Sequence, residues 1–290
     1  MKARRFFFSK NLTTSMTCTL ALAGALIIGV PVSHASGPAF DGLNKDKFDK
    51  VIRELSGNSS YHSVTGAGSL GDVFGFEIGL VGGLTSTPEI NSISKSVDAS
   101  ADVGRLPHAS ILAAVSVPFG ITGEVLLFPS VEIGDVKYQQ FGGAIKWTAN
   151  DVLPVLPFNL AVRAFVTQNE LSFKQKLQNV STGGISTDVT VTQDNSQFGL
   201  QLLASPSLPF VEPYIGIGTV NATGKLKVSG HPTGTIFDPT LTTSQSAESS
   251  PSSFQFLAGV NASLVGFKFG LEYSRVFETD SFNFKLGFGF

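Results

Sequence analysis

Charged and amide side chains recur in this chain at positions that alternate with apolar ones, and this spacing limits the chemistry that they could do. Successive side chains of an extended chain point to opposite faces, so these polar residues would share one face. Both signs of charge occur, so the residues could line a selective conduit or pair with one another across a narrow interior. The charged members are Glu77, Lys146, Arg163, Glu212, Lys268, Glu272 and Lys285, and the amide members are Gln140, Gln197, Gln201, Asn261 and Asn283.

Acid–base and metal chemistry finds little support in the sequence. His62, His108 and His231 are isolated along the chain, and no spacing of histidines and acidic residues is typical of a metal site. Residues 66–71 match the pattern G-x-G-x-x-G, but a dinucleotide site needs a strand before this pattern and a helix after it. Here a strand is expected to follow. We therefore expect no enzymatic activity, no catalytic residues, no metal and no cofactor.

From about residue 70 onward, apolar residues alternate with small or polar ones, which is typical of β-strands with one apolar face. Phe74, Phe76, Ile78 and Leu80 are one such series. Ten segments of this kind predict ten strands, and twelve are possible if the region 186–228 contains a further hairpin. The expected strands cover residues 72–84, 109–117, 121–133, 137–149, 158–173, 186–203, 210–228, 253–264, 266–276 and 281–290.

Composition and connection lengths favour a closed barrel over residues 70–290. Charged residues make up 14% of the chain, well below the roughly 25% that is usual in soluble domains. Beyond residue 35, no apolar stretch approaches the roughly 18 residues of a membrane-spanning helix. Connections after even-numbered strands are short, whereas several after odd-numbered strands are long and polar. We expect an all-β, antiparallel up-and-down barrel that spans a membrane; the alternative is a secreted soluble β-sandwich or lipid-binding barrel.

The last ten residues form a strand with one apolar face, made by Phe282, Phe284, Leu286, Phe288 and Phe290. This strand resembles the C-terminal strand of bacterial outer-membrane β-barrel proteins, which the barrel-assembly machinery reads. The resemblance implies that these five residues form an assembly signal, and that the partners are the assembly machinery and the lipids of the bacterial outer membrane. Short turns on the periplasmic side of such barrels would place both termini in the periplasm.

Two features precede the expected barrel. Residues 1–35 combine a basic start, an apolar run over residues 20–32 and a small-x-small site ending at Ala35, which is the layout of a signal peptide. Residues 36–69 would form a periplasmic or lumen-plugging segment with a short amphipathic helix at about 44–56. This helix could fill the lumen, dock on a periplasmic partner or pack against the periplasmic rim. Its apolar side is formed by Phe48, Val51, Ile52 and Leu55.

The sequence leaves two functions open for such a barrel. It could be a narrow channel or binding barrel for small solutes, with selectivity set by the polar lumen residues. Alternatively, it could be a non-conducting structural or adhesive surface protein that acts through its external loops. A formal net charge of −2 argues against nucleic acid as a partner. Removal of residues 1–35 would also remove Cys18, the only cysteine, which excludes disulfides in the mature chain.

Overall fold

The computed structural model describes residues 45–71, 73–97, 99, 102–134, 136–151, 157–179, 185–206, 208–232 and 245–290. All of them belong to one compact unit. The expected signal peptide and the residues up to 44 lie outside the described part. Within the described part, no helix is both long enough and apolar enough to span a membrane.

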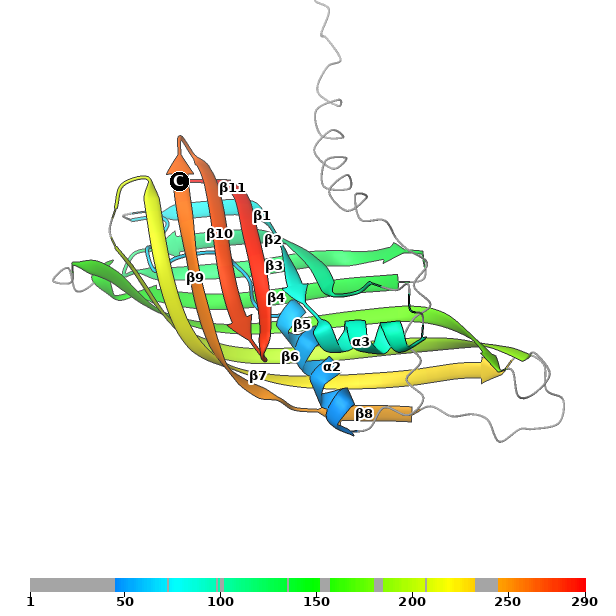
Figure 1. Cartoon of the computed structure of the whole chain (residues 1–290). Helices are drawn as coiled ribbons and strands as arrows, with labels where there is room; N and C mark the ends of the chain where they lie inside the picture. The colour runs from blue at the N-terminus through cyan, green and yellow to red at the C-terminus, as the bar shows by residue number, and fades with distance from the viewer. Residues whose placement is uncertain are drawn as a thin grey trace, which may run out of the picture. The chain divides into compact units, whose positions relative to one another are not determined.

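Strands make up most of the described chain (Figure 1). They are β1 (Gly75–Ser86), β2 (Arg105–Val117), β3 (Ile121–Ile133), β4 (Val136–Thr148), β5 (Phe158–Asn179), β6 (Ile185–Pro206), β7 (Val211–Pro232), β8 (Gln245–Ser249), β9 (Ser252–Leu264), β10 (Phe267–Val276) and β11 (Thr279–Gly289). A short 3-10 helix, η1 (Ala149–Asp151), follows β4.

The strands form one antiparallel sheet that closes on itself. Apart from β8 and β9, strands adjacent in the sequence pair with each other, and β1 pairs with β11 to close the ring. Strands β8 and β9 pair with the same edge of β7, and they are separated at Pro251, which has no backbone N–H to donate. Counted together, β8 and β9 form one wall strand, the eighth in chain order, so the wall has ten strands. The predicted antiparallel barrel of ten strands is therefore confirmed.

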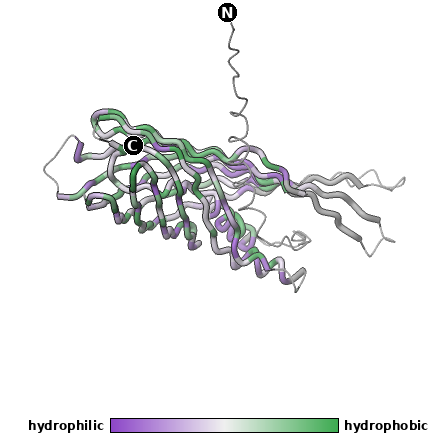
Figure 2. The backbone as a smooth tube through the Cα atoms, turned by 90° about the horizontal axis from the view of Figure 1, so that it is seen from above, coloured by the Kyte–Doolittle hydropathy of each residue, from purple (hydrophilic) through white to green (hydrophobic). Residues whose placement is uncertain are grey.

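The outer surface of the barrel is apolar. Large side chains recur at every second position, for example Ile78, Leu80 and Leu84 of β1, and they are exposed on the outside. Hydrophobic residues recur in the same way along the other barrel strands (Figure 2). A closed barrel leaves no unpaired strand edge, and an apolar outer belt suits contact with lipid tails.

The two ends of the barrel differ in their connections. At one end, which we call the short-turn end, short connections join β2–β3, β4–β5, β6–β7 and β9–β10. We call the opposite end the long-loop end. At the short-turn end, both residues of the two-residue turn Val265–Gly266 adopt positive φ angles, as such hairpin turns require. Phe119 and Gly120, in the three-residue turn between Val117 and Ile121, also have positive φ angles. Strand β11 runs from the long-loop end to the short-turn end, where the chain ends at Phe290.

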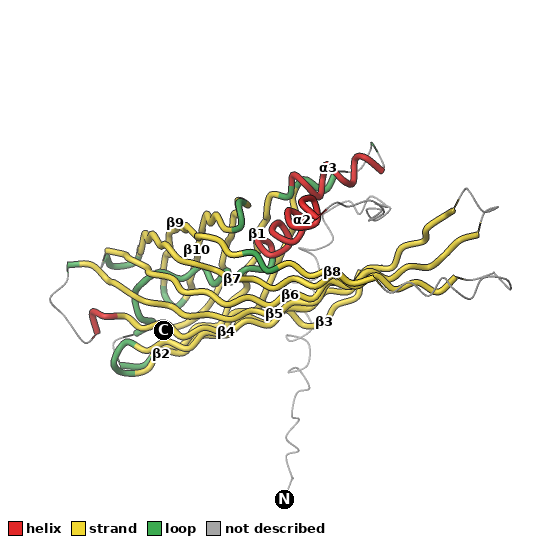
Figure 3. The backbone as a smooth tube through the Cα atoms, turned by 90° about the horizontal axis from the view of Figure 1, so that it is seen from below, coloured by secondary structure: helices red, strands yellow, loops and turns green. Residues whose placement is uncertain are grey.

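Two helices, α2 (Lys45–Asn58) and α3 (Pro88–Val97), lie together at the long-loop end (Figure 3). Val51 of α2 packs against Ile90 and Ile93 of α3. The Glu54 carboxylate accepts hydrogen bonds from the backbone N–H groups of Glu89 (2.6 Å) and Ile90 (2.9 Å). It therefore satisfies two of the free N–H groups at the start of α3.

The sequence prediction missed α3 and made several strands too short, among them β2, β5, β6 and β7. Helix α3 lies in the expected loop 85–108, although Pro88 at its first position is a known helix-start signal. The expected loop 174–185 is mostly strand, because β5 and β6 pair with each other as far as Asn179 and Ile185. Likewise, β7 and β8 occupy parts of the expected loop 229–252. Mutual pairing stabilises these polar stretches as strands although they have no apolar face.

The two ends of the described chain lie at opposite ends of the barrel. Helix α2 begins at Lys45 at the long-loop end, whereas Phe290 lies at the short-turn end. The prediction put both termini on one side. In the structure, the start of β1 and the end of β11 both lie at the short-turn end. Helix α2 lies at the opposite end, because the chain between α2 and β1 passes through the barrel. Residues 1–44, including the N-terminus itself, lie outside the described part.

Candidate functional site: the filled lumen

A stretch of chain without helix or strand, residues 59–70, runs through the interior of the barrel, and we call it the plug. It follows α2 at the long-loop end, and at the short-turn end the Leu70 N–H donates to Ser116 Oγ of β2 (3.0 Å). Residues 59–67 are all buried. A stretch of this length can span about 40 Å when extended, which is enough to cross the barrel.

The plug pairs with no strand, so its backbone polar groups need other partners. Side chains of the barrel wall provide them. The bonds run from Gln140 Nε2 to Ser59 O (3.1 Å), from Lys146 Nζ to Gly66 O (2.9 Å) and Gly68 O (2.7 Å), from Thr148 Oγ1 to Ala67 O (2.7 Å), and from Gly68 N to Glu212 Oε1 (2.8 Å). The polar wall residues therefore act as hydrogen-bond partners of a peptide backbone.

A buried ion pair joins β5 and β3, the two strands on either side of β4. Arg163 Nη1 lies 3.5 Å from Glu124 Oε2, and each side chain is only 1% exposed. Arg163 also donates to Gln201 Oε1 (2.6 Å), and to the Ser63 (2.5 Å) and Thr65 (2.7 Å) hydroxyl groups of the plug. A buried charge is tolerated only when it is paired and hydrogen-bonded, and both conditions are met here.

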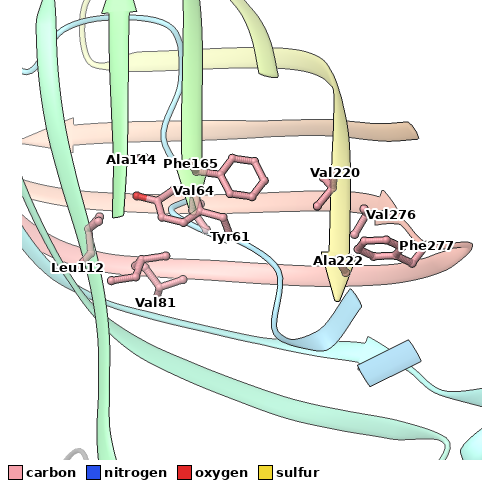
Figure 4. Close-up of a cluster of buried hydrophobic side chains, with 11 residues drawn as sticks. Tyr61, Val64, Val81, Leu112, Ala144, Phe165, Val220, Ala222, Val276 and Phe277 are labelled. Atoms are coloured by element: carbon pink, nitrogen blue, oxygen red, sulfur yellow. The ribbon is translucent and has the colours of Figure 1, made fainter. Parts of the chain in front are cut away.

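Tyr61 of the plug completes this cluster. Its hydroxyl donates to Glu124 Oε2 (2.9 Å), its ring stacks on Phe165 of β5 with a centroid distance of 5.1 Å, and the Arg163 guanidinium lies 5.5 Å from its ring centre. Figure 4 shows Tyr61, Val64 and Phe165 side by side inside the barrel. The plug is thus held by apolar packing as well as by polar contacts.

Lys146 and Arg163 are directly opposite each other on β4 and β5, where like charges would normally be destabilising. Each has its own oxygen partners: plug carbonyl groups for Lys146 and Glu124 for Arg163. These separate oxygen partners offset the repulsion between the two neighbouring cations.

A second polar cluster links β1, β7, β10 and β11. Lys285 Nζ lies 2.7 Å from Glu77 Oε1, and the two side chains are 2% and 1% exposed. Glu272 accepts hydrogen bonds from the Tyr214 hydroxyl (2.9 Å) and from Asn283 Nδ2 (3.2 Å). One ion pair and two hydrogen bonds to a carboxylate therefore link these four strands inside the barrel.

His62 of the plug and His108 of β2 are brought together by the fold. Their rings stack with a centroid distance of 4.7 Å, and Asn283 contacts both rings. His108 also contacts Asn58 at the end of α2 (3.2 Å). Within the described part of the chain, no three histidine, cysteine or acidic side chains gather as metal ligands would.

The structure locates each residue that was predicted to line the lumen. Glu77, Lys146, Arg163, Glu272 and Lys285 are buried in the interior, as are the amides Gln140, Gln197, Gln201 and Asn283. Glu212, Lys268 and Asn261 are half-buried. The five apolar residues of the expected assembly signal, Phe282, Phe284, Leu286, Phe288 and Phe290, are exposed on the outside of β11.

The prediction overlooked Glu124, Tyr61 and the histidine pair. Glu124 lies in the predicted strand 121–133 and alternates with residues of the outward face. The same alternation that identified the other inward residues could therefore have predicted that Glu124 points into the barrel. No sequence signal could have paired Tyr61 with Glu124, or His62 with His108. These contacts depend on the path of the plug through the barrel.

Comparison with known proteins gives a family but no activity. A family model described as "Family of unknown function (DUF6588)" matches residues 39–290. No curated protein sequence matches the chain.

Several solved structures are similar at low identity. The outer membrane protease OmpT from Escherichia coli matches with 13% identity over 75% of this chain and 96% of its own, with a TM-score of 0.39. The translocator domain of the autotransporter NalP from Neisseria meningitidis matches with 9% identity over 76% and 89%, with a TM-score of 0.43. Ail, the attachment invasion locus protein of Yersinia pestis, matches with 14% identity over 75% and 97%, with a TM-score of 0.29. Likenesses this distant carry no information about the activity of this chain.

Proposed function

We propose that this chain, which belongs to the DUF6588 family, a family of unknown function, is an outer-membrane β-barrel protein with a closed, non-conducting barrel, and that it acts at the cell surface through its long-loop end. The observation that carries this proposal is the plug. Residues 59–67 are buried along the interior, and wall side chains hold their backbone at both ends of the barrel.

The partners of the lumen charges support the same proposal. In a conduit, charged side chains would face water and the passing solute. Here Arg163, Glu124, Glu77 and Lys285 are each at most 2% exposed and face one another. Of the two functions that the sequence left open, this arrangement favours the non-conducting surface protein over the solute channel.

The features available for contact with a partner are at the long-loop end. It carries α2 and α3, and β5, β6 and β7 are each 22 residues long, about twice the length that crosses a membrane in such barrels. Outer-membrane barrels have short turns on the periplasmic side, so we assign the long-loop end to the outside.

Conductance in planar lipid bilayers tests this proposal. The purified mature protein, folded in detergent and shown to be folded by its different migration on a gel with and without boiling, should give no steady open channel. Arg163→Ala should give brief openings, because it removes hydrogen bonds to Ser63 and Thr65 of the plug. Arg275→Ala is the matched control, because Arg275 is exposed and pairs with Asp280 outside the lumen.

A steady conductance of the wild-type protein would refute the proposal. The proposal would also be refuted if Arg163→Ala stayed closed while Arg275→Ala conducted, because the plug would then not be the barrier.

A further inference from the structure

The short-turn end of the barrel presents apolar side chains at the tips of its turns. Phe119 lies in the β2–β3 turn, Phe210 in the β6–β7 turn and Val265 in the β9–β10 turn, and they are 74%, 73% and 90% exposed. Turn tips that stand in water are usually glycine, proline, asparagine, aspartate or serine. These three tips therefore need apolar surroundings that the described part of the chain does not supply.

The backbone conformation at these tips makes large apolar residues there more unusual. Phe119, Phe210 and Val265 have φ angles of 71°, 69° and 49°. Glycine, asparagine and aspartate tolerate this left-handed region, whereas bulky and β-branched residues are strained in it. Backbone strain of this kind is concentrated at functional positions. The three side chains therefore have a role that outweighs the strain of their turns.

The turn between β10 and β11, at the long-loop end, provides an internal comparison. Phe277 and Glu278 of this turn also have positive φ angles. Here, however, the Phe277 side chain is buried and Glu278 is the exposed residue. The tip of this turn is therefore polar, whereas the tips at the short-turn end are apolar, which indicates different surroundings at the two ends.

The backbone of the short turns is satisfied within the barrel. In three of these turns, a carbonyl group accepts a hydrogen bond of 2.8 Å from an N–H group of the neighbouring strand. The bonds run from Thr148 to Gly120, from Ser263 to Phe210 and from Gly289 to Gly266. Lipid offers no hydrogen-bond partners, so backbone that borders on it must be bonded internally. These three turn carbonyl groups meet that condition.

The length of β10 places its turn at the edge of the bilayer. Arg275 lies on the outward face of β10 and pairs with Asp280 of β11. Charged side chains are costly against the lipid core, so this pair marks the limit of the apolar belt on the long-loop side. The segment 265–275 is eleven residues long, and a tilted barrel strand needs about 9–11 residues to cross a membrane. The opposite surface of the bilayer therefore lies at Val265.

We propose that the rim of the short-turn end is a lipid-binding surface, in which Phe119, Phe210 and Val265 insert among the lipid head groups and anchor this end of the barrel. The apolar belt continues into the rim without a break, because the exposed residues Val117 and Ile121 flank the turn of Phe119. Lipid that covers the belt therefore reaches the tips as well. At the level of the head groups, water and soluble reagents still reach the turns.

The single tryptophan, Trp147, makes a depth measurement by fluorescence possible. It is exposed on the outer face of β4, directly opposite Ile121. The full mature protein is placed in phosphatidylcholine vesicles whose acyl chains carry bromine, a quencher, either near the head group or near the chain end. Wild-type Trp147 should lose emission in brominated vesicles, because this part of the wall touches lipid.

Two variants report the depth of the tips themselves. Phe119→Trp and Phe210→Trp, each combined with Trp147→Phe, should lose emission mainly to bromine near the head group. Lys50→Trp in the same Trp147→Phe background is the control, because Lys50 is exposed on α2 at the long-loop end. It should lose no emission to either brominated lipid and should be quenched by acrylamide more strongly than the two tip variants.

The inference fails if Phe119→Trp and Phe210→Trp behave like Lys50→Trp while wild-type Trp147 is quenched by lipid. The rim would then stand in water, free for a soluble partner. Migration on a gel with and without boiling shows that each variant is folded, and either tip variant alone is sufficient for the measurement.

The inference rests on the barrel lying in a membrane, as the proposed function does, but it does not need a closed lumen. A conducting barrel whose tips are quenched by lipid would overturn the closed state alone. A closed barrel whose tips stand in water would overturn the lipid-binding rim alone. Wild-type Trp147 that no brominated lipid quenches would overturn the membrane assignment on which both rest.

Discussion

At the scale of single residues, the lumen shows how a β-barrel can hold buried charges in its interior. Arg163 has four kinds of partner, namely a carboxylate, an amide, two hydroxyl groups and an aromatic ring. The two hydroxyl groups and the aromatic ring belong to the plug. A charged side chain on the wall can therefore be a structural anchor, and its charge alone does not indicate a transport pathway.

Removing one partner of this ion pair should be costly. Arg163→Ala leaves Glu124 buried without its cation, and such a loss typically destabilises a protein by about 3–5 kcal/mol. Urea unfolding in detergent, followed by loss of the unboiled gel band, measures the change. Arg275→Ala removes an exposed ion pair and should leave the unfolding midpoint nearly unchanged. Equal midpoints for the two variants would contradict the structural role of Arg163.

At the scale of elements, β1 and β11 form the seam that closes the barrel. The seam extends to the last residue, because Phe76 N donates to Phe290 O (2.8 Å) and Phe290 N donates to Phe76 O (3.0 Å). The two rings are also in edge contact, with centroids 4.4 Å apart. The end of the chain thus takes part in closure and is not a frayed terminus.

Phe290→Ser should lower the amount of assembled barrel in the outer membrane. It removes the ring contact at the seam and the terminal aromatic residue of the strand that resembles an assembly signal. The measurement is the fraction of protein in the folded, unboiled gel band from outer-membrane preparations. Phe282→Ser is the control, because Phe282 lies on the same face of β11 and is 66% exposed, close to the 64% of Phe290. A larger loss for Phe282→Ser would show that the terminal position has no special part in assembly.

At the scale of the whole molecule, the plug makes the chain cross the barrel once more before β1 begins. If the short-turn end faces the periplasm, α2 faces outward, and the described chain starts and ends on opposite sides. The barrel then presents two helices and the long strands β5, β6 and β7 to the outside.

Cysteine labelling of intact cells tests this orientation. The only cysteine is Cys18, within the expected signal peptide, so an introduced cysteine would be the only thiol of the mature chain. Lys50→Cys, on α2 with a side chain that is 61% exposed, should react with a membrane-impermeant maleimide. Val265→Cys, at the short-turn end and 90% exposed, should react only after the outer membrane is permeabilised. The reverse pattern would place the long-loop end in the periplasm.

The sequence by itself determined the strands of the barrel wall and the direction of their side chains. Alternation such as that of Phe282 to Phe290 specifies which face of a strand is apolar, and short turns such as Phe119–Gly120 specify antiparallel neighbours, because both properties are local. The ten strands and the inward direction of Arg163 and Lys285 follow from that period of two. The tertiary structure alone decided what the inward residues contact. Tyr61 contacts Glu124, which is 63 positions away in the sequence, and His62 contacts Asn283, which is 221 positions away. An irregular segment such as the plug has no sequence periodicity from which its path could be predicted. Whether polar residues line a pore or bind a peptide therefore depends on where that segment runs, which only the folded barrel reveals.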